Sequence, residues 1–195
     1  MNFKLVLSSL TFILVLFLIF KKEDVAETQI YKGNIMGTSY NITLQSDISG
    51  EDAHFKAYNI LQKVNQEMST YIDDSLISKV NKADIGKWVK VSQDFLDVLS
   101  FATALCKDTR GIYDISIGKL VNLWGFGPDS VDKEPSAEEL SYFSSQVGCN
   151  SIELDHLNLS IKKVKDVELD FSSIAKGFAV DKVYEFLIKQ PYLNS

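Results

Sequence analysis

The densest group of reactive and charged side chains in the sequence lies in the stretch ELDFSSIAKGFAVD, residues 168–181. The first half of this stretch alternates as a β-strand does, and the second half has the small residues typical of a helix start. Their junction brings a carboxylate, two hydroxyls and an ammonium within seven positions, at Asp170, Ser172, Ser173 and Lys176. A helix N-terminus presents unpaired N–H groups and partial positive charge, so this junction could bind a phosphate group.

Two of these side chains could extend such a site, but a plainer interpretation also exists. Lys176 would add a positive charge beside a phosphate, and Ser173 could offer an oxygen to a hard cation such as Mg²⁺. Alternatively, Ser172 only caps the helix and Lys176 is a solvated side chain. Because short polar motifs often match by chance, spacing alone favours the plainer interpretation.

Two aromatic stretches are further candidates. In MSTYIDD, residues 68–74, Tyr71 could stack on a flat ring or serve as an amphipathic plug, and taken alone the plug is favoured. Asp73 and Asp74 are expected to cap the next helix. In WGFGP, residues 124–128, two glycines around an aromatic indicate a tight loop against something planar, or a turn packed on the core.

Composition excludes several kinds of site. The chain has 195 residues, a net charge of -6 and a single arginine, Arg110, so it is a poor candidate for nucleic-acid binding. No CxxC, HExxH or GxSxG spacing occurs, and His54 and His156 lack partners at a recognisable spacing. Cys106 and Cys149 could form a disulfide or remain two buried thiols, and the sequence leaves both possibilities open.

The elements that would position these residues come in mixed order, which predicts an α+β fold with a mixed sheet and helices packed on it. The predicted helices cover 51–68, 75–80, a segment capped by Ser92 and closed by Gly111, a segment from the Ser136–Glu139 capping box to about Gly148, and 173–189 before Pro191. The predicted strands are 31–46 in two parts broken at Met36-Gly37, then 87–91, 151–154, 158–162 and 167–171, with a short strand opening 111–128.

The N-terminus is predicted to lie outside this fold. Leu5–Phe20 carries no charge, which suits a signal anchor or a signal peptide over residues 1–22. Residues 23–31 are expected to form a polar linker, and residues 32–195 the folded domain. The lysines that flank the apolar run lie on both sides, so they orient an anchor only weakly.

Four motifs in succession closely resemble those of one family, the bacterial FAD:protein FMN transferases, or ApbE lipoproteins. They are MGTSYNITL, MSTYIDDSLISKVN, GIYDISIGKLVNLWGFGP and ELDFSSIAKGFAVD, and the resemblance spans Lys32 to about Ile188. It implies the ApbE-like flavin transferase fold and a reaction that uses FAD as substrate with magnesium. In that reaction FMN passes to a Thr or Ser hydroxyl of a target protein and AMP leaves.

The resemblance also assigns roles to individual residues. It implies that Ser173 is a magnesium ligand and leaves the catalytic residue unknown. The positions that match the family's FAD-contacting residues are Met36, Tyr71, Ile112, Tyr113, Asp114, Asp170 and Lys176. The implied partners are FAD, the membrane and an acceptor protein of a membrane redox complex. The implied location is the inner membrane, with the globular part on the periplasmic side.

Features of the family's later half, among them a His-containing motif and an Ala-Asp…Thr segment, have no match in this sequence. We therefore expect the domain to be an incomplete copy that lacks transfer activity alone. The cysteine that follows the apolar run in many family lipoproteins is not found after Phe20 either. The alternative function is a non-catalytic, membrane-anchored remnant or flavin-binding module.

Overall fold

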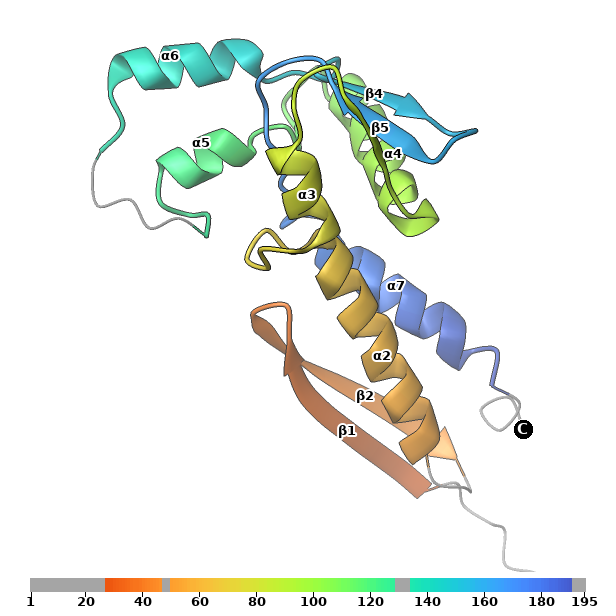
Figure 1. Ribbon diagram of the computed structural model, residues 1–195. Helices are drawn as coiled ribbons and strands as arrows, with labels where there is room; N and C mark the ends of the chain where they lie inside the picture. The colour runs from red at the N-terminus through yellow and green to blue at the C-terminus, as the bar shows by residue number, and fades with distance from the viewer. Residues whose placement is uncertain (1–26, 47–49, 129–133, 191–195) are drawn as a thin grey trace, which may run out of the picture.

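The structure is a computed structural model that describes residues 27–46, 50–128 and 134–190. The apolar run Leu5–Phe20 and Pro191, the predicted end of the last helix, lie outside the described residues. The described elements form the predicted α+β arrangement, with two small antiparallel sheets and helices packed beside them (Figure 1). None of the helices described is both long enough and apolar enough to cross a membrane.

A long β-hairpin opens the described chain. β1 (Glu27–Ile35) pairs antiparallel with β2 (Thr38–Ser46) over the full length of both strands. Met36 and Gly37 form the two-residue turn at φ 52° and 70°, as the type I′ geometry of tight hairpins requires. The predicted break at Met36-Gly37 is confirmed, and β1 begins inside the segment expected to be a linker.

The helix α2 (Glu51–Met68) contacts both β1 and α7 (Ala175–Leu187) (Figure 1). Its predicted inner face is confirmed, because four residues at helical spacing are buried: Ala57, Leu61, Val64 and Met68. This helix therefore fixes the hairpin against the rest of the core, and its last turn points toward the loop that carries Tyr71.

The short helix α3 (Leu76–Lys82) follows that loop. Its N-cap is Ser75, whose hydroxyl accepts a backbone N–H from the first turn at 3.1 Å. The predicted caps Asp73 and Asp74 are wrong, because Ser75 is the residue whose side chain reaches the exposed N–H groups. Asp73 instead pairs with Lys82 at 3.3 Å.

A three-stranded antiparallel sheet lies beside α4 (Gln93–Asp108), in the order β3-β5-β4 (Figure 1). These strands are β3 (Trp88–Lys90), β4 (Ile152–Asp155) and β5 (Ser160–Lys163). The predicted cap of α4 is confirmed, since the Ser92 hydroxyl accepts the backbone N–H of Phe95 at 3.0 Å.

Two helices lie at the margin of the molecule, α5 (Gly118–Leu123) and α6 (Ala137–Gln146) (Figure 1). The capping box of α6 is confirmed, with Ser136 and Glu139 each accepting from the other's backbone N–H. None of the residues of α6 is buried. This helix therefore contributes little to the core.

Two predicted strands are wrong. Residues 111–117 form turns, and 167–171 contribute only an isolated parallel bridge between Ile117 and Glu168. The 167–171 segment is extended, but its backbone groups bond to loops and to one side chain instead of to a neighbouring strand. Its apolar residues still belong to the core, where the ring centroids of Phe95 and Phe171 lie 5.0 Å apart.

Candidate functional site

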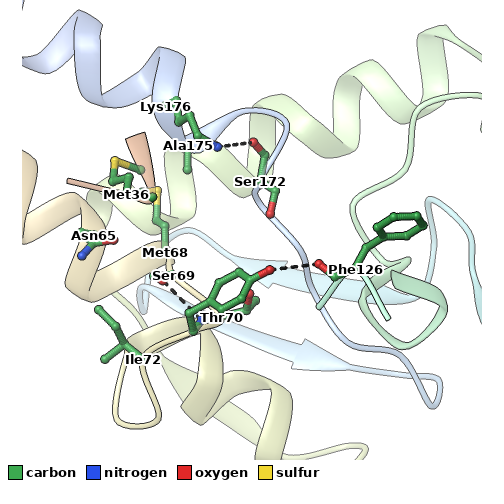
Figure 2. A pocket seen from close by; sticks show the side chains of 12 residues that line it. Met36, Asn65, Met68, Ser69, Thr70, Ile72, Phe126, Ser172, Ala175 and Lys176 are labelled. Atoms are coloured by element: carbon green, nitrogen blue, oxygen red, sulfur yellow. Dashed lines mark hydrogen bonds between the residues drawn. The ribbon is translucent and has the colours of Figure 1, made fainter. Parts of the chain in front are cut away.

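A cavity of about 680 Å³ opens between the hairpin turn, the last turn of α2 and the start of α7 (Figure 2). This volume lies within the usual range for small-molecule sites, roughly 300–1,000 Å³. Its lining comes from segments far apart in the sequence: Met36, Gly37, Asn65, Met68, Ser69, Thr70, Tyr71, Ile72, Phe126, Ser172, Ala175 and Lys176.

The loop after α2 presents an exposed aromatic ring at this cavity. Tyr71 is 66% exposed, so it is not a buried plug. Its hydroxyl donates to the backbone carbonyl of Phe126 at 3.0 Å, across 55 residues of sequence. Phe126 itself is 77% exposed and belongs to the WGFGP loop. Two solvent-exposed rings at one opening could pack against a planar ligand.

The opposite wall is apolar and comes from the hairpin turn and α2. Met36 stands at the turn with φ 52°, which only a few per cent of non-glycine residues adopt. Figure 2 shows Met36 close to Met68 on one side of the cavity, and Phe126 on the other. Methionine side chains adapt to irregular apolar surfaces, so this wall suits the edge or face of a ring system.

The start of α7 forms the polar end of the cavity. Ile174 is the N-cap residue and makes no capping hydrogen bond with its side chain, so Ser172 is not the cap of this helix. Lys176 is exposed, and its ammonium lies 3.4 Å from the carbonyl of Ser172 (Figure 2). The helix start therefore offers a flexible positive charge beside its N-terminal N–H groups.

Asp170 lies in a second cavity of about 180 Å³, which shares Thr70 and Tyr71 with the first. One oxygen of the Asp170 carboxylate accepts the backbone N–H of Ser172 at 2.6 Å. The shared residues show that the two cavities adjoin at the Tyr71 loop. We use the name cleft for the two cavities together.

Four other predicted site residues do not line the cleft. The Tyr113 hydroxyl lies 3.1 Å from the Ser173 hydroxyl, which ties the 111–117 segment to the start of α7. Ile112 is 92% exposed and points into solvent. Asp114 accepts the backbone N–H of Ser116 at 2.8 Å. The structure thus groups Met36, Tyr71, Asp170 and Lys176 in the cleft, while Ile112, Tyr113, Asp114 and Ser173 lie outside its lining.

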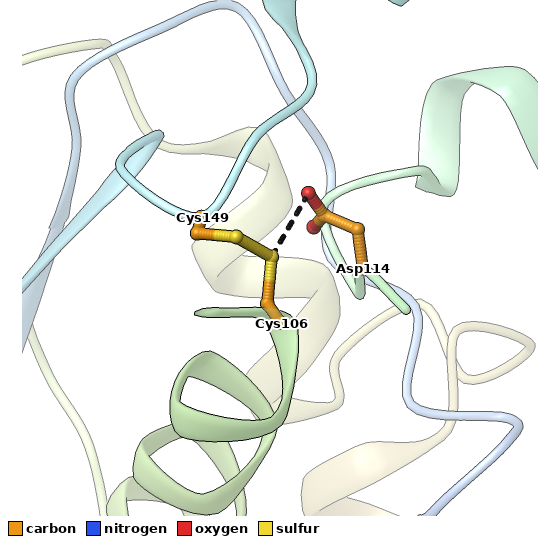
Figure 3. A group of neighbouring side chains, drawn as sticks. All are labelled: Cys106, Asp114 and Cys149. Carbon is orange, nitrogen blue, oxygen red and sulfur yellow. Dashed lines mark hydrogen bonds between the residues drawn. A yellow bond between two sulfur atoms is a disulfide. The ribbon is translucent and has the colours of Figure 1, made fainter. Parts of the chain in front are cut away.

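Of the two states left open for the cysteines, the structure has the disulfide. Cys106 and Cys149 are bonded, with their Cα atoms 5.6 Å apart. Figure 3 shows Asp114 facing this bond, with one carboxylate oxygen 3.5 Å from the Cys106 sulfur. Because neither sulfur carries a proton in a disulfide, this approach is a contact and not a hydrogen bond.

Within the described residues, these same three side chains are the only cluster with enough potential ligands to hold a metal ion. The sulfurs of Cys106 and Cys149 are bonded to each other and so are not thiolate ligands. The Ser173 hydroxyl is a single neutral oxygen, whereas Mg²⁺ needs near-octahedral oxygen coordination. The described residues therefore do not complete a magnesium site, and we assign no chemical step to a metal.

A sequence model described as the ApbE family matches residues 36–194, most of the chain. The chain belongs to the ApbE family. Among its relatives, the FAD:protein FMN transferase of Haemophilus influenzae is 41% identical over 80% of this chain and 47% of the relative. The FAD:protein FMN transferase of Vibrio cholerae is 35% identical over 88% of this chain and 52% of the relative.

Solved structures agree with this assignment. The flavin transferase ApbE from Vibrio cholerae superposes with a TM-score of 0.79 at 34% identity, covering 85% of this chain and 54% of that structure. The flavinyl transferase ApbE of Pseudomonas stutzeri, in its apo form, superposes with a TM-score of 0.79 at 28% identity. This match covers 84% of this chain and 56% of that structure. The ApbE fold expected from the motifs is confirmed. The chain spans about half the length of these ApbE proteins.

Several cleft residues were not predicted. Asn65 and Met68 belong to the last turns of α2, where the apolar periodicity indicated only core packing. Asn81 and Asn122 line the second cavity, and neither stands out by residue type or spacing. Phe126 and Pro128 belong to the WGFGP loop, which was expected either to lie against something planar or to form a turn packed on the core. The other positions depend on contacts between distant segments.

Proposed function

We propose that this chain binds FAD in the cleft and that its family chemistry is the transfer of FMN from FAD to a protein hydroxyl. The observation that supports this most is the composition of the cleft. An apolar and aromatic end lies beside a polar end at the start of a helix, which matches a flavin ring linked to a diphosphate. The proposed reaction is taken from the relatives, which are named FAD:protein FMN transferases.

In this proposal the flavin ring lies against Met36 and Tyr71, and the diphosphate extends toward Ser172 and Lys176. Asp170 would accept a hydrogen bond from the ligand at the second cavity. Tyr71 contributes ring contact, Lys176 positive charge, and the N–H groups of α7 further donors to phosphate oxygens.

The proposed reaction is phosphoryl transfer. The oxygen of a Thr or Ser hydroxyl on the acceptor forms a bond to the phosphorus on the riboflavin side of FAD. The phosphoanhydride bond breaks, AMP leaves with its electron pair, and the hydroxyl proton passes to solvent or to a base. Ser173 would be one magnesium ligand.

Flavin binding is tested first, by titrating the purified chain with FAD and following flavin fluorescence. We expect Tyr71→Ala to weaken binding several-fold, because aromatic stacking contributes roughly 0.5–1.5 kcal/mol beyond the buried area. Tyr184→Ala is the matched control, since Tyr184 is 63% exposed and lies outside the cleft lining. Equal FAD affinity in both variants and the parent would refute the proposed ring contact.

Transfer is tested separately, because the chain spans about half the length of its relatives. An acceptor protein with a single Thr flavinylation site is incubated with FAD, Mg²⁺ and either this chain or the Vibrio cholerae relative. Covalent flavin is then read by in-gel fluorescence. Labelling by this chain would establish a transferase, whereas FAD binding without labelling would favour the alternative of a flavin-binding module.

We also propose a location: an anchor at residues 1–22 in the inner membrane, with the globular part on the periplasmic side. The uncharged run Leu5–Phe20 and the resemblance to a family of lipoproteins support this proposal. A reporter that is active only in the periplasm, fused after Ser195, should be active. Activity of a cytoplasm-specific reporter at the same position would contradict it.

A further inference from the structure

The segment that carries Asp170 is extended but has no strand beside it. Along one edge of this segment, backbone groups form hydrogen bonds with the 115–118 loop. The Gly118 N–H donates to the Glu168 carbonyl, and the Asp170 N–H donates to the Ile115 carbonyl, each at 2.9 Å. A Cβ atom at Gly118 would lie 2.8 Å from that carbonyl, so this close approach needs a glycine. These two bonds hold one edge of the segment.

The other edge is held by a single side chain. The Leu169 N–H donates to Oδ1 of Asn81 at 2.7 Å, and Nδ2 of Asn81 donates to the Leu169 carbonyl at 2.9 Å. The carboxamide thus makes the donor and acceptor pair that a neighbouring strand would make. Among side chains of this size only asparagine can do so, because aspartate lacks the donor and leucine lacks both groups.

The backbone of Asn81 is itself held by a hydrogen bond from a buried lysine. It lies in the last turn of α3, and its backbone carbonyl accepts from the ammonium of Lys163 at 2.6 Å. Lys163 is only 6% exposed, and burial lowers the pKa of its ammonium. This buried donor holds the backbone of Asn81 in place, which limits how far its side chain can shift. The register of residues 168–170 is therefore set from the α3 side as well as from the 115–118 loop.

From this geometry we infer that Asn81 is a positioning residue of the cleft, which fixes Leu169 and thereby directs the neighbouring Asp170 carboxylate and the start of α7 toward the ligand. The inference rests on the proposed FAD site. Asp170 is one residue from the Asn81 contact, and its carboxylate in turn accepts the Ser172 N–H. A shift of Leu169 would therefore move the polar end of the cleft.

The experiment compares Asn81→Leu and Asn81→Asp with the parent chain, and uses Asn158→Asp as the matched control. Asn158 is an exposed asparagine in the turn between β4 and β5, where it bonds to Asp155. FAD affinity is measured by fluorescence well below the melting temperature. Hydrogen–deuterium exchange of the peptide covering residues 167–173 is measured without FAD, with the β1–β2 hairpin peptide as internal reference.

We expect FAD affinity to fall about tenfold in Asn81→Leu, a loss comparable to one net hydrogen bond, and less in Asn81→Asp, which keeps the acceptor. Exchange of the 167–173 peptide should rise in the same order, while the reference peptide stays unchanged. A residue that only stabilised the fold would lower the melting temperature without changing the affinity of the folded protein. Asn158→Asp should alter neither measurement.

Three results would overturn the inference: unchanged exchange at 167–173, faster exchange with unchanged FAD affinity, or global unfolding of both Asn81 variants, which would make Asn81 a residue of the whole fold. If the parent chain itself binds no FAD, the proposed function fails. The exchange measurement still decides in that case whether Asn81 orders the segment.

Discussion

The middle and the start of α7 differ in how their charges are paired. In the middle, the ammonium of Lys182 donates to Asp94 at 2.8 Å, and Lys63 donates to the other oxygen of the same carboxylate at 2.8 Å. The Asp94 side chain is only 14% exposed. At the start of the helix, Lys176 makes one long contact of 3.4 Å, and Asp170 accepts one backbone N–H.

This difference separates a structural cluster from a binding surface. The Asp94 carboxylate joins α2, α4 and α7, and both of its oxygens are already used. The charges at the start of α7 retain hydrogen-bonding capacity and line the cleft, so they can bind a ligand without first giving up strong partners. Changes in the first region should therefore affect stability, and changes in the second should affect FAD affinity.

The largest effect is expected for Phe171→Ala, which alters the core directly beneath the cleft. Phe171 is fully buried, and truncation of a buried phenylalanine costs about 3–5 kcal/mol. Urea unfolding followed by circular dichroism measures this loss. Phe101→Ala is the control, because Phe101 is 61% exposed and should lose less than about 1 kcal/mol. Similar losses for both would contradict the core position of Phe171.

A smaller loss is expected for Asp94→Asn. Removal of the charge leaves Lys63 and Lys182 without their carboxylate, and should cost about 1–2 kcal/mol of unfolding free energy, since the lysines remain partly solvated. Asp52→Asn, which alters an exposed pair with Lys56, should cost about 0.5 kcal/mol or less. FAD affinity should be unchanged in both, and a loss of affinity in Asp94→Asn would break the separation between the two regions.

The same carboxylate predicts a pH dependence. Burial raises the pKa of Asp94, but the hydrogen bonds from Lys182 and Lys63 outweigh it and hold the pKa below its ordinary value of 3.8. A lowered pKa gives stability that is present above pH 3.8 and lost as pH falls through the folded-state value. The difference in unfolding free energy between the parent and Asp94→Asn should therefore shrink below that pH. A constant difference from pH 7 to pH 3 would argue against this assignment.

Local signals explain what the sequence predicted well. The α2 stripe, the Ser92 cap, the Ser136–Glu139 capping box and the Met36-Gly37 turn each depend on residues close together in the chain. Such features follow from side-chain periodicity and backbone conformation alone. They are confirmed for that reason.

Apart from the α3 cap, which is Ser75 and not Asp73 or Asp74, the failures and omissions concern contacts between residues far apart in the sequence. The 167–171 segment alternates as a strand does, but its partners are a loop and the Asn81 side chain, 88 residues away from Leu169. The Tyr71 hydroxyl meets Phe126 across 55 residues, and neither residue signals that contact. The cleft could be predicted only through the resemblance of its motifs to a family, because its walls meet only after the chain has folded.

The smallest effect is expected for Lys176→Met, which removes the positive charge at the start of α7 but keeps an apolar stem. Because Lys176 is exposed, its attraction to a diphosphate is screened by solvent, and FAD affinity should fall only about twofold to fivefold. The fall should be larger at low salt and should nearly vanish near 1 M salt, where the screening length is about 3 Å. Lys189→Met, two residues past the other end of the same helix, should change affinity at neither salt concentration. Equal losses in the two variants would mean that FAD responds to the net charge of the chain, and the start of α7 would then have no special role in binding.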